Sequence, residues 1–195
     1  MKSIYIVLTK TDTIVARAIR WFTGATYSHA SLSLNHKLCP MYSFARKYVN
    51  FPFIGTMVKE EAGAGVYGKF SKVPCCILRI PVSDNQYDEV KKMVDTMWHS
   101  HQYRYNYFGL VLNYLGISKQ HDKRFFCSEF VYYVLGHNNI IDLGKPPSLV
   151  KPQDFLNTSA EIIYEGNLND LKNPQLSMQN PISAQKSEKT KTKKS

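Results

Sequence analysis

A cysteine at the expected start of a helix offers the clearest chemistry in this chain. The run Arg124–Gly136 begins as a short loop and continues as an apolar helix whose first turn holds Cys127. A helix N-terminus carries a partial positive charge and several free N–H donors, and both favour the nucleophilic thiolate form of cysteine. The alternative is a buried structural cysteine that packs as a small hydrophobic side chain.

A nucleophilic cysteine needs a base, and His29 is the best-placed histidine for this role. The segment Tyr27–Leu34 alternates between apolar and polar residues, a pattern that predicts a half-buried strand. His29, Ser31 and Ser33 share the polar face, with the histidine at the start of the strand. The alternative is a histidine at the surface, or one whose hydrogen bonds are satisfied in the core.

The other histidines fall in turns, in loops or at helix ends. His99 with His101, and His36 with Cys39, have the spacing of metal-binding pairs. Neither has the second pair that a zinc site needs, so we expect no metal. We also expect no cofactor.

The pattern of elements predicts an α+β fold. Strands are expected at 3–9, 27–34, 41–45, 73–82 and 161–164, and helices at 11–24, 84–100, 105–115 and 127–136. Residues 47–72 are rich in Gly and aromatic residues and show little periodicity, which indicates either a functional loop or concealed short strands. We predict one domain over residues 1–167 and a polar, Lys-rich, disordered tail over 168–195.

Composition limits the compartment and the partners. No apolar run approaches the ~18 residues of a membrane span, and the apolar N-terminal run is too short for a signal peptide. The four cysteines do not suggest a disulfide scaffold, and free thiols suit a reducing compartment, so we predict a cytoplasmic protein. The net charge is +10, of which the Lys-rich end of the tail carries +4, and this basic tail predicts weak contact with an anionic surface. The body has no motif for specific nucleic-acid binding.

Two motifs and their order resemble those of a known enzyme family. Gly24–Leu32 fits the pattern G-x-x-[YF]-S-H-[VA], and Phe126–Val131 fits [YF]-C-S-E-[LF]-[VI]. These patterns, with the histidine strand before the cysteine helix, are similar to the circularly permuted papain-like amidases, the YiiX-type branch of the NlpC-like superfamily. Tyr105–Leu110 also resembles the family's Tyr/Asp-Tyr-x-Gly-Leu segment. The resemblance covers roughly residues 1–165 and omits the tail.

The resemblance implies a permuted papain-like fold, in which an antiparallel sheet packs against helices that include the nucleophile helix. It implies that Cys127 is the nucleophile and His29 the base. The backbone N–H of Cys127 would bind the oxyanion, with Tyr27 and Ser128 as further candidates for oxyanion or substrate binding. Glu129 is expected to interact favourably with the helix dipole in the first turn.

The family carries a third residue, on the strand after the histidine, that orients the imidazole. Ser43 matches this position best, where the family has Glu, Gln, Asn or His. A serine hydroxyl can accept the imidazole N–H but stabilises imidazolium less than a carboxylate does. The hairpin register decides whether Ser43 faces His29, because a slip of one residue would place Tyr42 or Phe44 there.

Three functions follow from this resemblance. The first is a thiol hydrolase that cleaves amide or peptide bonds through a thioester on Cys127, acting on a small peptide or amide. The second is a thiol acyltransferase or lipid hydrolase of the lecithin:retinol acyltransferase-like type, acting on acyl groups. The third is a non-catalytic binding module on the same scaffold, which the weak third residue Ser43 would favour.

Overall fold

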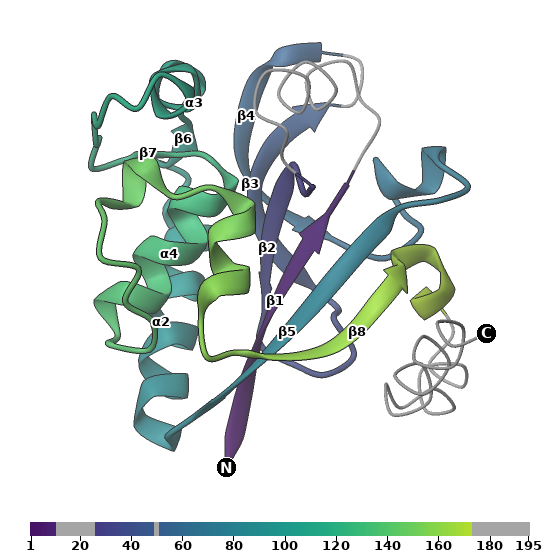
Figure 1. The fold of residues 1–195 in the computed structure, drawn as a ribbon. Coiled ribbons are helices and arrows are strands. Elements are labelled where there is room, and N and C mark those ends of the chain that lie inside the picture. The colour runs from purple at the N-terminus through teal and green to yellow at the C-terminus, as the bar shows by residue number, and fades with distance from the viewer. Residues whose placement is uncertain (11–25, 49–50, 173–195) are drawn as a thin grey trace, which may run out of the picture.

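The computed structural model describes residues 1–10, 26–48 and 51–172, which form an α+β fold (Figure 1). The strands are β1 (Lys2–Thr9), β2 (His29–Ser33), β3 (Met41–Tyr48), β4 (Phe51–Glu60), β5 (Pro74–Val82), β6 (Arg104–Tyr105), β7 (Arg124–Phe125) and β8 (Glu161–Asn167). The helices are α2 (Asp84–Ser100), α3 (Tyr107–Tyr114) and α4 (Cys127–His137), with 3-10 turns η1 (Tyr67–Lys69), η2 (Pro147–Leu149), η3 (Pro152–Asn157) and η4 (Leu168–Lys172). The helix predicted at 11–24 lies outside the described residues.

A six-stranded antiparallel sheet in the order β4-β3-β2-β1-β5-β8 forms the centre of the molecule. β1 is a central strand because its residues are apolar on both sides: Ile4, Ile6 and Leu8 lie on one face, and Tyr5 and Val7 on the other. The two short strands β6 and β7 pair in parallel beside α3.

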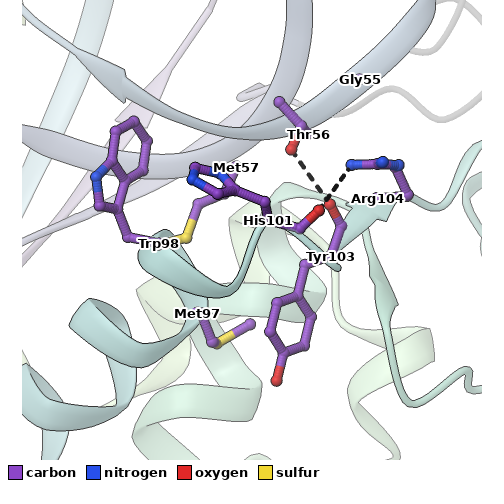
Figure 2. Close-up of a pocket in the computed structure, with 8 residues that line it drawn as sticks. All are labelled: Gly55, Thr56, Met57, Met97, Trp98, His101, Tyr103 and Arg104. Carbon is purple, nitrogen blue, oxygen red and sulfur yellow. Dashed lines mark hydrogen bonds between the residues drawn. The ribbon is translucent and has the colours of Figure 1, made fainter.

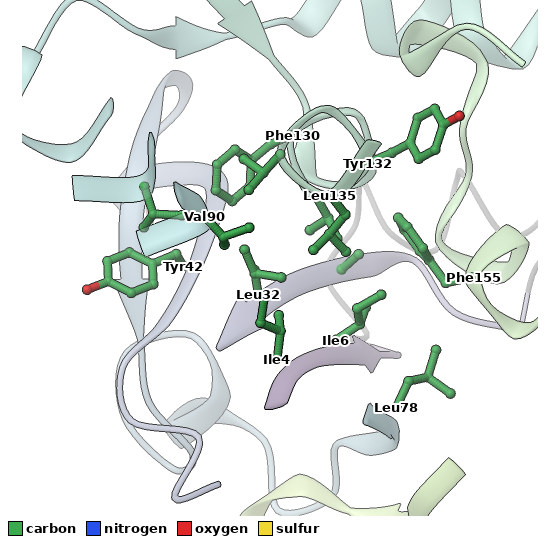
Figure 3. Close-up of a cluster of buried hydrophobic side chains, with 14 of the residues drawn as sticks. Ile4, Ile6, Leu32, Tyr42, Leu78, Val90, Phe130, Tyr132, Leu135 and Phe155 are labelled. Atoms are coloured by element: carbon green, nitrogen blue, oxygen red, sulfur yellow. The ribbon is translucent and has the colours of Figure 1, made fainter. Parts of the chain in front are cut away.

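The main core lies between one face of this sheet and the helices α2 and α4 (Figure 3). The sheet contributes Ile6 and Leu32, α2 contributes Val90, and α4 contributes Phe130 and Leu135, all fully buried. Nearly every residue of α4 from Cys127 to Leu135 is buried, so this helix lies inside the fold rather than at its surface. This packing fixes the start of α4 against the start of β2.

The opposite face of the sheet is also buried. Ser31 and Ser33 were expected on a polar face of a half-buried strand, but both have no exposed surface. A second core, which includes Tyr67 and Leu168, covers this side. The folded chain therefore continues beyond the expected boundary at residue 167, since the Leu168 N–H also donates to the Val73 carbonyl at 2.9 Å.

The segment 47–72 contains a long strand rather than only a loop. β4 pairs antiparallel with β3 from Met41 opposite Glu60 to Tyr48 opposite Phe51, with a register shift near its start. Gly55 lies against the Tyr105 side chain, closer than any other residue type could approach. That glycine interrupts the strand pattern in the sequence, and Glu60 closes the strand at its far end.

The local signals for α2 are confirmed. Ser83 accepts a hydrogen bond from the Gln86 N–H, and the Gln86 side chain accepts one from the Ser83 N–H, both at 3.1 Å, which makes a capping box. α3 is shorter than expected because Asn106 caps it from outside the helix. Within the described ranges, no helix combines the length and apolar character that crossing a bilayer requires.

Candidate active site

Glu60 holds the imidazole of His29 at the edge of the second core. The Nε2–H of His29 lies 3.1 Å from both carboxylate oxygens of Glu60. The Ser31 hydroxyl donates to the same carboxylate at 2.6 Å, and the Tyr67 hydroxyl donates to it at 3.3 Å. Thr9 supports Tyr67 in turn, with 3.4 Å between the two hydroxyl oxygens. The Glu60 carboxylate thus accepts hydrogen bonds from three side chains, those of His29, Ser31 and Tyr67.

The cysteine thiol lies on the other side of the same imidazole. Cys127 is the first residue of α4 and is hydrogen-bonded to His29. Because Nε2 faces Glu60, Nδ1 is the ring nitrogen left for the sulfur. The backbone N–H groups of Ala30 and Ser128 also donate to this sulfur. Cys127 is 5% exposed, so it is buried at this site.

Charge at this site favours an ion pair over neutral groups. Burial lowers the pKa of His29, but the charges of Glu60 and Cys127 and the hydrogen bonds to both raise it well above its usual 6.5. Burial raises the pKa of the Cys127 thiol, but His29 and the two backbone N–H donors lower it below its usual value. Burial also raises the pKa of Glu60, but the charge of His29 and the hydrogen bonds from His29 and Ser31 lower it more. The pKa of this carboxyl is therefore below its usual value. The expected state is thiolate, imidazolium and carboxylate in a row.

Ser43 does not make the hydrogen bond that the sequence predicted for it. It is fully buried on β3 opposite Val58, and among the described residues its hydroxyl has no hydrogen bond of normal geometry. The hydroxyl is nevertheless close enough to Glu60 to help lower the pKa of that carboxyl. The longer Glu60 side chain reaches over β3 to Ser31 on β2, and it orients His29 from there. The small Ser43 side chain leaves room for the Glu60 side chain to cross β3.

Tyr27 and Ser128, the other predicted site residues, direct their side chains elsewhere. The Tyr27 hydroxyl is hydrogen-bonded to Cys76, and its pKa is raised to about 12 by burial and by the charge of Cys76. The Ser128 hydroxyl donates to the Val150 carbonyl at 2.7 Å. Ser128 therefore acts on the Cys127 sulfur only through its backbone N–H, which lowers the thiol pKa.

Glu129 caps α4 from within its first turn. Its carboxylate accepts hydrogen bonds from the Phe126 N–H at 3.2 Å and from the Asn106 side-chain amide at 3.5 Å. The second carboxylate oxygen is buried and has no partner among the described residues. Burial raises the pKa of Glu129 to about 7. Glu129 thus lies in the first turn of α4, where its buried carboxylate caps the Phe126 N–H.

Glu60 and Tyr114 were not among the predicted site residues. Tyr114 ends α3 near Cys127, and its pKa is raised by burial and by the charge of that cysteine. Its sequence context is an apolar helix, which carries no signal for a site. Glu60 did leave a signal, because it and the adjacent Glu61 are carboxylates at the end of a β-rich run that begins at Phe51.

A cleft of about 540 Å³ lies elsewhere, between the end of α2, β4 and β6 (Figure 2). Its lining is Gly55, Thr56, Met57, Met97, Trp98, His101, Tyr103 and Arg104. The Thr56 hydroxyl and the Arg104 guanidinium donate to backbone carbonyls there. Cys127, His29 and Glu60 do not line it. Across the described part of the chain, no three His, Cys, Asp or Glu side chains gather as metal ligands would.

Comparison with protein-family models, curated proteins and solved structures finds no match for this chain. Its function is therefore inferred from the arrangement of Cys127, His29 and Glu60. Their order along one line of hydrogen bonds, and the direction of each pKa shift, are the observations available for that inference.

The residue that orients His29 can be identified by alkylation of Cys127 at pH ~6. We expect Glu60→Gln to slow the reaction about tenfold, because loss of the carboxylate charge destabilises imidazolium and raises the thiol pKa by about one unit. Ser43→Ala should change the rate less than about twofold, since no hydrogen bond is lost. Mass spectrometry of the Cys127 peptide measures the rate separately from exposed Cys39. An equal loss in Ser43→Ala would make Ser43 the orienting group.

Glu129 should make the protein less stable as the pH rises. Its pKa is about 7 in the folded chain against an ordinary 4.5, so the stabilisation is full below about 4.5 and is lost as the pH passes 7. Glu129→Gln should reduce the fall in unfolding free energy between pH ~5 and ~8 by roughly 2–3 kcal/mol. Urea unfolding at both pH values measures it, with exposed Glu89→Gln as the control. An unchanged pH dependence in Glu129→Gln would contradict the assignment.

Proposed function

We propose that this protein is a thiol hydrolase of amide or peptide bonds, with Cys127 as nucleophile, His29 as acid and base, and Glu60 as the orienting carboxylate. We further propose that its fold is the permuted papain-like type. The fold proposal is supported by the antiparallel sheet, the helix that starts at the cysteine, and the histidine strand that precedes it in the chain.

In the first step, the Cys127 thiolate attacks the carbonyl carbon of the substrate. The developing oxyanion accepts the backbone N–H of Cys127, which lies in the first turn of α4 and has no intrahelical acceptor. The imidazolium of His29 then gives its Nδ1 proton to the leaving nitrogen as the carbon–nitrogen bond breaks. The products are a free amine and a thioester on Cys127.

In the second step, water resolves the thioester. Neutral His29 takes a proton from the attacking water, and Glu60 stabilises the imidazolium that forms again. Collapse of the tetrahedral intermediate expels the Cys127 thiolate and releases a carboxylic acid. The thiolate–imidazolium pair is then ready for another cycle.

The single observation that carries this proposal is the line from the Cys127 sulfur through the His29 ring to the Glu60 carboxylate. A binding module does not need a thiol that is activated in this way. The case for such a module depended on Ser43 as a weak third residue, and the carboxylate of Glu60 removes that support.

A second candidate is a thiol acyltransferase or lipid hydrolase, which shares the first step but takes an acyl group from a lipid. The observation in its favour is the exposed apolar side of α3, including Phe108 and Val111, on the helix that ends near Cys127 at Tyr114. Incubation with a labelled acyl-peptide and, separately, a labelled phospholipid distinguishes the two. Labelled acyl-Cys127 should accumulate with only one of them.

The activated thiol can be tested without knowing the substrate. We expect wild-type Cys127 to react with iodoacetamide well below the ordinary thiol pKa of about 8.5, and to keep reacting as the pH rises. His29→Ala should move the midpoint up to about 8.5 and slow alkylation at pH ~6 by roughly 10- to 100-fold. His36→Ala, at an unrelated histidine, should match the wild type. A thiol whose midpoint is already ordinary in the wild type would exclude the proposed mechanism.

A further inference from the structure

α3 exposes several of its apolar residues and buries its one amide side chain. The exposed side chains are Phe108 (60%), Val111 (58%), Leu115 (67%) and, just beyond the helix, Ile117 (51%), which together form the apolar α3 surface. Asn113, on the inner side, is buried. A helix at the surface of a protein in water normally has the opposite arrangement, so this one indicates a site of interaction.

Internal hydrogen bonds hold the helix in this orientation. The Asn113 amide donates to the Ser148 carbonyl at 2.8 Å, and Asn106 caps α3 by accepting the Gly109 N–H at 2.8 Å. Asn106 also donates to Glu129 at the start of α4. Rotation of α3 to bury its apolar side would break these hydrogen bonds. The buried amides would then lack partners, which costs folding free energy. The apolar α3 surface is therefore a fixed feature.

Exposed cations come shortly before and after the apolar α3 surface in the chain. They are Arg104, Lys119, Lys123 and Arg124, and Asp122 is the only acidic residue between positions 104 and 124. The Lys119 ammonium lies 5.5 Å from the centre of the Phe108 ring. Within the described residues, none of these four cations forms an ion pair. An apolar ridge bordered by unpaired cations is the pattern of helices that lie in the headgroup region of anionic membranes.

We propose that the apolar α3 surface inserts into an anionic lipid bilayer and holds the Cys127 site close to it. Tyr114, at the end of the same helix, is close enough to Cys127 for the charge of that cysteine to raise its pKa, so docking would hold the Cys127 site near the membrane. A second copy of this chain is a poorer partner, because a two-fold contact would bring the same cations together. This docking does not depend on the thiol chemistry.

Flotation of the full chain with vesicles tests the proposal. We expect binding to phosphatidylcholine vesicles that contain phosphatidylserine and little binding to phosphatidylcholine alone. The double variant Phe108→Ser/Leu115→Ser should lower the partition coefficient at least about tenfold. Lys119→Gln/Lys123→Gln should lower it roughly fivefold for each charge removed. Ile162→Ser, at a side chain on β8 that is 42% exposed, is the matched control and should bind as the wild type does.

The same experiment can overturn the proposal in three ways. If both double variants bind vesicles as strongly as the wild type does, the binding belongs to the basic tail and not to the apolar α3 surface. Equal binding to the two kinds of vesicle would remove the role of the cations. A concentration-dependent dimer in size-exclusion chromatography, lost in Phe108→Ser/Leu115→Ser, would assign the surface to a second copy. Thermal unfolding of each variant establishes that it is folded.

Discussion

The interaction on which the site depends is the buried ion pair between His29 and Glu60. Burial by itself would favour a neutral imidazole and a neutral thiol, because ions lose hydration energy inside a protein. Here each charge has several partners. Ser31 and Tyr67 donate to the carboxylate, and two backbone N–H groups donate to the sulfur of Cys127. The imidazolium lies between two anions, so the ionised state is favoured.

The two-sided burial of the sheet makes this arrangement stable. β2 and β4 are not neighbours, since β3 lies between them, and the Glu60 side chain has to pass over β3 to reach β2. The small, buried Ser43 allows that passage. On the same side, Tyr67 of the second core closes the space above the carboxylate and adds a donor. A sheet with one face in water would expose this ion pair and weaken it.

The positions of Cys127 and His29 in the fold could be predicted from the sequence because each residue lies in a local motif. Cys127 begins a helix, His29 begins an alternating strand, and both elements occur where the patterns placed them. The α+β class was also predictable, as an alternation of strand and helix patterns. Glu60 was not, because its contact with His29 depends on the pairing and twist of three strands. Gly55 and the aromatic residues around it hid the strand that carries Glu60.

Other differences have the same physical origin. The β2 serines read as a polar face, but η1 and η4 cover them through contacts between segments far apart in the sequence. The hydroxyl of Tyr27 interacts with Cys76 on β5, a pairing set by the order of strands in the sheet. Local patterns specify which elements form, and tertiary packing decides which side chains meet.

The order of segments along the chain has a consequence for biosynthesis. The ribosome makes β2 and β4 before α4, so His29 and Glu60 exist before Cys127 does. The contact between His29 and Cys127 has a large sequence separation, and contacts of this kind are slow to form in folding. In an incomplete chain the Cys127 thiol therefore keeps an ordinary pKa. That pKa falls only once the fold has brought His29 against the sulfur.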